Sequence, residues 1–177
     1  MEIVYYVATS LDGFIATSTG EVGWLDTLPI DHQATGYDAF WETVDGLVMG
    51  RNTYDFVWNH GEWPYGDRPV WVCTRRDLVA MDGCNLQPER QPEAAIARSR
   101  EMGIKKLWLV GGGQLARTLL EQGNLTHLSV SVMPILLGAG VPLVAALPQS
   151  LILHQEQSVA QGGFTQIDYR LGDRAET

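Results

Sequence analysis

Two glycine-containing turns are the features of this sequence best suited to binding chemistry. The first, Gly50-Arg51-Asn52-Thr53, follows a short apolar run that ends at Met49, and the second, Gly111-Gly112-Gly113, follows the apolar run 107–110. A helical pattern follows each turn. Helix N-termini offer free backbone N–H groups and a positive dipole end, and glycine lets an anion approach the backbone. Two such turns on neighbouring strands suit a pyrophosphate, and hence a dinucleotide.

Both turns also have a purely structural interpretation. Most glycines serve backbone geometry, and either turn is compatible with a tight connection that binds nothing. Neither is the G-x-G-x-x-G fingerprint that follows the first strand of a Rossmann domain. The first predicted strand leads instead into Asp12-Gly13, a turn signal. A common Rossmann dehydrogenase is therefore not expected.

The elements that position these turns follow from the apolar pattern. The order of strands and helices predicts an α/β fold whose central sheet is mostly parallel and has an antiparallel C-terminal edge. Asn52 or Thr53 is expected to cap the second helix. We find no linker or repeat, so residues 1–177 are expected to form one domain. The predicted strands are 2–8, 46–49, 70–74, 85–87, 107–110 and 125–134, the helices are 33–44, 52–58, 91–103 and 113–122, and the final strand pair is 149–157 with 163–171.

Composition narrows the classes of function. The net charge is -9, and basic residues cluster only at Arg75-Arg76 and Lys105-Lys106, so a nucleic-acid surface is not expected. The two cysteines and four histidines lack metal-ligand spacing, and no metal site is expected. No apolar run approaches the ~20 residues that span a bilayer, and the N-terminus does not resemble a signal peptide. A cytoplasmic protein without membrane or nucleic-acid partners is expected.

The two turns resemble the cofactor signatures of dihydrofolate reductases. The stretch Met49–Asp55, MGRNTYD, resembles M-G-R-x-T-[YW]-[DE], and Trp108–Leu115, WLVGGGQL, resembles the strand and glycine turn of the second signature. The stretches 8–16, ATSLDGFIA, and 134–143, PILLGAGVPL, are more similar to the reductase domain of the bifunctional riboflavin biosynthesis enzyme and its stand-alone relatives. The resemblance covers roughly residues 2 to 171 and implies a single-domain, three-layer dihydrofolate reductase-like fold.

In that family the two turns together hold NADPH. The resemblance implies that Thr74 and Arg75 bind the adenosine 2′-phosphate and that the Ala8 backbone meets the nicotinamide amide. It also implies a cis peptide between Gly111 and Gly112. The loop at Gly23-Trp24 resembles the mobile loop that closes over the nicotinamide. The residues expected to contact the phosphates are Gly50, Arg51, Asn52 and Thr53 on one side and Gly112, Gly113, Gln114 and Leu115 on the other.

The substrate side departs from true dihydrofolate reductases. These carry a carboxylate on the first helix, whereas Ala34 falls near that position here. The candidate catalytic residues are Asp38, about one helical turn away, and Asp12, which follows the first strand. Each also has a structural interpretation: Asp38 as a surface residue, and Asp12 as the first residue of an Asp-Gly turn. Ser131 is a further candidate to point into the substrate cleft, whereas the side chain of Ser129 is expected to point to the opposite face of the sheet.

These features predict an NADPH-dependent reductase that transfers a hydride to a C=N or C=O bond of a small heterocycle such as a pyrimidine or pterin. The alternatives are a non-catalytic nucleotide-binding module of the same fold and a dihydrofolate reductase proper. The zinc signature of a deaminase is absent. A small-molecule substrate and a homodimer are expected, with the apolar residues Ile135, Leu136 and Leu137 as a candidate contact or as core.

Overall fold

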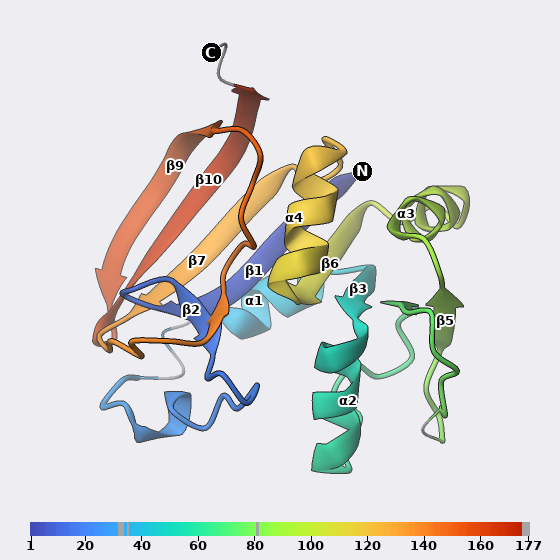
Figure 1. Cartoon of the computed structure of the whole chain (residues 1–177), viewed down its shortest axis with the longest axis horizontal. Coiled ribbons are helices and arrows are strands. Elements are labelled where there is room, and N and C mark those ends of the chain that lie inside the picture. Colours follow the sequence, from blue (N-terminus) through green and yellow to red (C-terminus); the bar gives the residue numbers. More distant parts are fainter. Residues whose placement is uncertain (32–33, 35, 81, 175–177) are drawn as a thin grey trace.

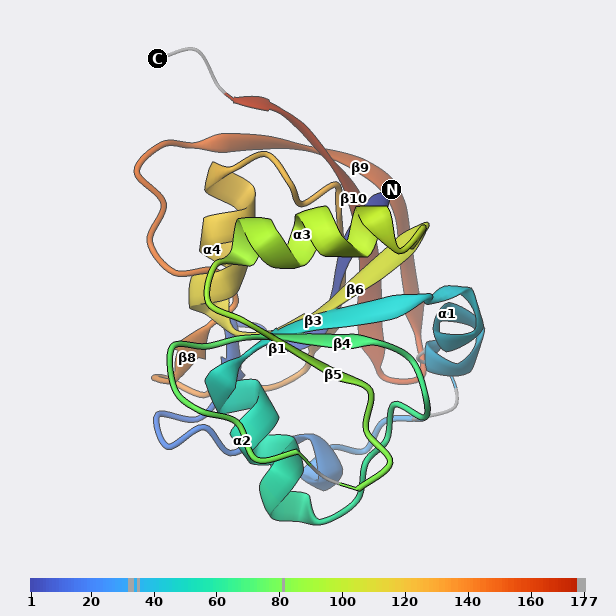
Figure 2. The same cartoon turned by 90° about the vertical axis from the view of Figure 1, so that its right-hand side faces the viewer.

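The computed structural model describes residues 1–31, 34, 36–80 and 82–174. An eight-stranded sheet forms the middle of three layers, and helices cover both of its faces (Figures 1 and 2). The α/β class and the dihydrofolate reductase-like layering predicted from the sequence are confirmed.

The sheet has the strand order β5-β4-β3-β6-β1-β7-β10-β9. The strands from β5 to β7 pair in parallel, while β10 pairs antiparallel with both β7 and β9. The parallel strands are nearly continuous apolar runs because helices bury both of their faces. The strands are β1 (Glu2–Ser10), β3 (Gly46–Gly50), β4 (Val70–Cys73), β5 (Leu86–Glu89), β6 (Lys106–Gly111), β7 (His127–Met133), β9 (Leu151–Gln161) and β10 (Phe164–Arg174).

Four α-helices form the outer layers in the described part of the chain. The helices α3 (Pro92–Glu101) and α4 (Gly113–Glu121) lie on one face of the sheet, and α1 (Tyr37–Thr43) and α2 (Arg51–His60) lie on the other (Figure 2). The helices α3 and α4 cover an apolar core that includes Leu107 and Leu109. The helices α1 and α2 cover a second core that includes Leu47 and Met49. A short 3-10 helix (Leu25–Thr27) precedes α1, and the strands β2 (Phe14–Ala16) and β8 (Val141–Pro142) form a small second sheet.

Two details differ from the sequence prediction. The helix predicted at 33–44 begins only at Tyr37, after Gly36 with a φ of 71°; residues 33 and 35 lie outside the described part of the chain. The expected cap at Asn52 or Thr53 was wrong, because α2 begins at Arg51 and its N-cap is Gly50, without a side-chain cap. Asn52 and Thr53 lie inside the first turn, where their own N–H groups are among those that a cap would satisfy.

Candidate functional site

The two glycine turns lie side by side. Strands β3 and β6 are neighbours, and Met49 pairs with Gly111 in their register. A Cβ atom on Gly50 would lie 3.9 Å from the carbonyl oxygen of Gly111, and one on Gly112 would lie 4.0 Å from the nitrogen of Gly50. The second turn is therefore close enough to the first for both to contact one small ligand.

The turns also lie where the direction of the chain crossing changes. After β3 the chain enters α2 on one face of the sheet, and after β6 it enters α4 on the opposite face (Figure 2). In open α/β sheets such a switch point leaves a crevice at the carboxyl ends of the two strands, and ligands bind there. The topology therefore places both turns at the expected binding edge.

Neither helix N-terminus at these turns is capped by a side chain. The N-cap residues are Gly50 for α2 and Gly112 for α4, and no acidic residue lies in the first turn of either helix. The first N–H groups of a helix have no acceptor within it, and the dipole adds partial positive charge there. The two turns thus bring together two sets of backbone donors without a carboxylate in the first turn of either helix.

The four glycines of these turns serve different purposes. A Cβ on Gly113 would lie 2.3 Å from the carbonyl oxygen of Pro142, and one on Gly111 would lie 3.2 Å from Thr53 Oγ1. Packing against backbone therefore requires glycine at position 113, whereas a Cβ at position 111 would need only a small shift of the Thr53 side chain. Gly112 has a φ of 105°, which disfavours any other residue. Gly50 has a φ of -79°, and a Cβ there would make only an ordinary van der Waals contact, so packing of the protein alone does not require a glycine there.

The expected cis peptide was wrong. Among the described residues all peptide bonds are trans, including the one between Gly111 and Gly112. The positive φ of Gly112 turns the chain into α4 instead.

Arg51 is held by acceptors of the protein itself. Its Nε donates to Asp55 Oδ1 at 2.6 Å and its Nη1 donates to the carbonyl oxygen of Asp77 at 2.7 Å. Arg76 Nη2 donates to the other oxygen of Asp55 at 3.3 Å. The structure therefore brings Arg76 to the pair formed by Arg51 and Asp55, whereas Arg75, exposed like Arg76, makes no such contact among the described residues. Sequence reasoning did not include Asp55 and Arg76, although the i,i+4 spacing of Arg51 and Asp55 is typical of a helical ion pair.

The remaining predicted cofactor residues flank this arginine pair and the turns. Thr74 Oγ1 accepts a hydrogen bond from the backbone of Arg76 at 3.0 Å, which shapes the loop after β4. Asn52 and Gln114 are exposed at the two helix starts. Leu115 points into the core, so only its backbone N–H remains for a ligand.

Ala8 lies beyond the point where β1 and β6 stop pairing. The two strands pair only as far as Tyr5 and Leu109, and the indole of Trp108 then donates to the carbonyl oxygen of Tyr6 at 3.0 Å. Ala8 packs against a small core of Trp24, Met133 and Phe164. Trp24 is 8% exposed, and its Nε1 has no partner in the described part of the chain. An unpartnered buried donor is unfavourable, so Trp24 Nε1 is a candidate hydrogen-bond donor to a ligand.

The helix α1 covers the adjoining part of the sheet with aromatic side chains. Phe40 stacks on Tyr6 with a centroid separation of 4.2 Å, and Trp108 meets both rings edge-on. Asp38 is exposed on this helix, where burial, and to a smaller extent the Asp38 charge, raises the pKa of Tyr37. Ala34, near the family's carboxylate position, packs beside the core around Trp24.

Asp12 joins two loops. Its carboxylate accepts hydrogen bonds from the Ser10 hydroxyl at 2.6 Å and from the backbone N–H groups of Leu137 and Gly138 at 3.1 and 2.7 Å. These hydrogen bonds lower the pKa of Asp12, and the bond from Ser10 has the largest effect. The anionic carboxylate of Asp12 holds the 137–138 segment through these hydrogen bonds; its catalytic role stays a prediction.

We expect Asp12→Ala to loosen the 137–138 segment. The amide protons of Leu137 and Gly138 should exchange at least about tenfold faster with solvent, because each loses a charged acceptor. Since the folded pKa of Asp12 is lowered, the wild-type protection should be present above the unfolded pKa and lost as the pH falls through the folded value. Hydrogen exchange read by NMR measures this; unchanged rates in the variant would contradict the role of Asp12, and Asp26→Ala, an exposed acid elsewhere, is the control.

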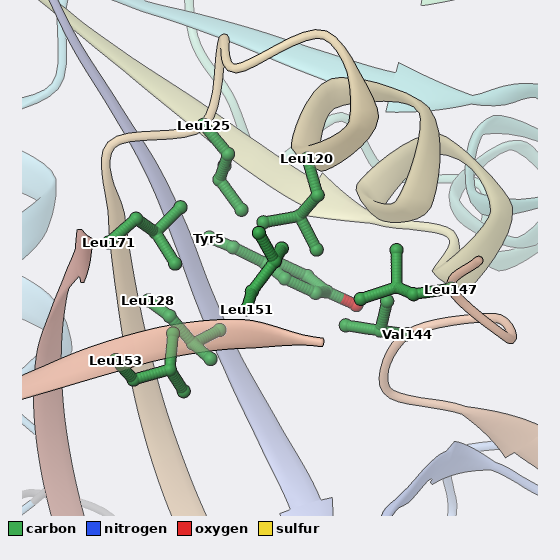
Figure 3. A pocket seen from close by; sticks show the side chains of 9 residues that line it. All are labelled: Tyr5, Leu120, Leu125, Leu128, Val144, Leu147, Leu151, Leu153 and Leu171. Atoms are coloured by element: carbon green, nitrogen blue, oxygen red, sulfur yellow. The ribbon is translucent and has the colours of Figure 1, made fainter. Parts of the chain in front are cut away.

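An apolar cavity of about 140 Å³ lies on the α4 face of the sheet. Aliphatic side chains from α4, β7, β9 and β10 surround the ring of Tyr5 (Figure 3), whose hydroxyl donates to the carbonyl oxygen of Leu143. None of the described residues that line the cavity is charged. It is therefore unsuited to phosphates, and the two glycine turns are the better candidate site.

Comparisons with known proteins agree with this fold. Residues 2–163 match the family described as the RibD C-terminal domain. A solved putative riboflavin biosynthesis protein from Shewanella sp. PV-4 is 34% identical, with a TM-score of 0.85 over 98% of this chain and 100% of that one. The protein YwjB of Bacillus subtilis (strain 168) is 29% identical over 94% of this chain and 95% of its own length.

A two-activity protein of Thermotoga maritima shares the fold at 12% identity. It is a diaminohydroxyphosphoribosylaminopyrimidine deaminase and 5-amino-6-(5-phosphoribosylamino)uracil reductase. The TM-score is 0.73, and the match covers 97% of this chain and 56% of that protein. In the described part of the present chain, no helix combines the length and the apolar character that crossing a membrane requires.

Proposed function

Because this chain belongs to the RibD C-terminal domain family, the reductase family of riboflavin biosynthesis, we propose that it is an NADPH-dependent reductase. Its substrate is a small heterocycle, a pyrimidine or a pterin-like ring, with a C=N or C=O bond. The observation that carries the proposal is the meeting of two uncapped helix N-termini at adjacent glycine turns. Two such donor sets suit the two phosphates of a dinucleotide.

The residues of the site fit NADPH. The backbone N–H groups after Gly50 and Gly112 would hold the pyrophosphate, and the cations at Arg51, Arg75 and Arg76 would meet the 2′-phosphate. Arginine binds phosphate through several N–H donors in one plane. In Arg51, Nε and Nη1 already donate to acceptors of the protein, and Nη2 is left to donate to a phosphate. When bound, NADPH supplies the hydride.

The protein contributes position and exclusion of water. The end of β1 at Ala8 and the loop at Trp24 would flank the nicotinamide, and the aromatic side chains of α1 would form the wall beside the substrate. Asp12 and Asp38 remain the candidate catalytic residues. The test is loss of NADPH absorbance with a panel of oxidised pyrimidines and pterins. No turnover with any ring, despite NADPH binding, would favour the alternative of a non-catalytic binding module, which Ala34 in place of a carboxylate also favours.

We expect Trp24→Phe to weaken NADPH binding about tenfold while the free energy of unfolding falls by no more than about 1 kcal/mol. The change removes a buried donor that has no partner among the described residues of the free protein but would donate to the bound ligand. Trp71→Phe is the matched control, because Trp71 Nε1 is also buried and unpartnered but belongs to the core under α3 and α4. Equal NADPH affinity in Trp24→Phe and wild type would remove Trp24 from the site.

A homodimer in the cytoplasm remains part of this proposal. The edge strand β9 is exposed along most of its length, and its Ile152 and Leu153 are 50% and 39% exposed. Of the apolar residues singled out in the sequence, only Leu136 is exposed, while Ile135 and Leu137 pack beside the core around Trp24. The strand β9 is thus a better candidate contact than the 135–137 segment, and light scattering after gel filtration tests it.

A further inference from the structure

A row of four polar side chains crosses the sheet next to the proposed site. Ser129 and Ser131 on β7 pair with Asp168 and Gln166 on β10, and we refer to these four residues as the acceptor row. Ser131 and Gln166 are 4% and 9% exposed, whereas Ser129 and Asp168 are half-buried. Both serines bond to Gln166, so the opposite facing expected for Ser129 was wrong; residues two apart on a strand share a face.

The side-chain donors of the acceptor row are engaged in hydrogen bonds within the row. The Ser131 hydroxyl donates to Gln166 Oε1 at 2.5 Å, and the Ser129 hydroxyl donates to Asp168 Oδ1 at 2.5 Å. The Gln166 amide nitrogen donates to Ser129 Oγ at 2.8 Å and to Asp168 Oδ1 at 3.3 Å. A serine has one donor, a primary amide has two, and an ionised carboxylate has none. Every side-chain donor of the row is therefore in use.

What remains is a set of acceptors. Asp168 Oδ2 has no hydrogen-bond partner among the described residues, and lone pairs are left on Ser131 Oγ, Gln166 Oε1 and Ser129 Oγ. The half-buried end, at Ser129 and Asp168, is the end that a ligand can reach. A ligand at this row must bring N–H or O–H donors, because another acceptor would face lone pairs.

The row adjoins the proposed substrate position. In the register of β1 and β7, Tyr6 pairs with Ser129 and Ala8 pairs with Ser131. Paired residues of neighbouring strands project from the same face, and the strands lie about 4.8 Å apart. The Tyr6 ring stacks on Phe40 of α1, so this is the face that carries α1. The acceptor row thus lies beside Ala8 and Tyr6 on the same face of the sheet.

We propose that the acceptor row recognises the substrate, and that it selects an uncharged nitrogen heterocycle presenting several N–H or NH₂ donors along one edge. This inference rests on the proposed function, since it places the substrate beside Ala8 on the α1 face. Asp168 and Ser129 are the specificity-determining residues. Rings that present only acceptors along this edge are rejected.

Calorimetric titration of the full chain with 6-aminouracil tests the inference, with and without saturating NADPH. This neutral probe carries ring N–H and NH₂ donors, and 1,3-dimethyluracil, which has no N–H group, is the matched probe. Wild type should bind 6-aminouracil at least about tenfold more tightly than 1,3-dimethyluracil, as expected for hydrogen bonds that include a charged acceptor. Asp168→Asn should lose about tenfold for 6-aminouracil, and Ser129→Ala should lose affinity in the same direction.

Controls separate this inference from the cofactor proposal. Glu156→Gln removes a carboxylate from the neighbouring strand β9 outside the row and should bind 6-aminouracil like wild type. NADPH affinity should be the same in Asp168→Asn and wild type. If Asp168→Asn binds 6-aminouracil as wild type does, or if wild type does not distinguish the two probes, the acceptor row does not recognise the substrate. Failure of NADPH to bind wild type would instead refute the proposed function.

Discussion

Gly50→Ala is expected to fold like wild type and to bind NADPH about 100-fold more weakly, a loss of about 2.7 kcal/mol. The backbone at Gly50 has a φ of -79° and a ψ of 163°, which alanine adopts without strain. The nearest atom to the added methyl group is 3.9 Å away, so the free protein accommodates it. The methyl group would nevertheless stand between the two turns, where a phosphate must approach the backbone.

Two measurements check this expectation. Thermal unfolding should give the same midpoint for Gly50→Ala and wild type, and titration with NADPH should show the loss of affinity. Glu101→Ala is the control, because Glu101 is exposed at the end of α3 and lies outside both turns and the loop at Trp24. An unchanged NADPH affinity in Gly50→Ala would show that no phosphate lies against this turn.

Gly113→Ala is expected to have the opposite pattern, with a direct loss of stability. Its Cβ would lie 2.3 Å from the carbonyl oxygen of Pro142 and 3.5 Å from the backbone nitrogen of Ala145, which itself donates to the carbonyl oxygen of Gly113. The obstacle is backbone rather than a flexible side chain, so α4 or the 142–145 segment must move. Overpacking of this kind lowers the free energy of unfolding by about 1–3 kcal/mol.

Urea unfolding followed by circular dichroism measures this change. The slope of the transition should stay constant while its midpoint falls, as for a change in stability alone. Gly23→Ala is the control for stability, with a change within about 0.5 kcal/mol, because a Cβ at this exposed glycine would meet no atom within 4 Å. A midpoint equal to that of wild type in Gly113→Ala would mean that the contact between α4 and the β8 segment is not close.

Much of the fold follows from local patterns. The continuous apolar run of β3 and the helical spacing after Gly113 specified a buried strand and a helix, and their order specified a parallel sheet. The strands β2 and β8 were not predicted, since pairs of two or three residues carry no periodic signal. The cap of α2 was assigned to the wrong residues because the Asn52 and Thr53 side chains suit a cap, whereas the chain geometry placed Gly50 there.

The sequence predicted only those features of the site that arise within a single turn or from the general rules of parallel sheets. The glycine turns and their adjacency followed from the sequence and from the carboxyl-end rule for parallel sheets. The contact of Arg76 with Asp55 did not, because it depends on how the loop after β4 meets α2. The acceptor row depends on the register between β7 and β10, which are separated by more than thirty residues along the chain. Such pairings are set by tertiary structure.

The most direct test of the central claim is titration of wild type and Gly50→Ala with NADPH and with NADH, followed by quenching of tryptophan emission. The two-turn site predicts micromolar binding of NADPH to wild type, weaker binding of NADH, and loss of both in Gly50→Ala while the variant remains folded. Absence of NADPH binding to wild type, or equal binding to both proteins, would contradict it.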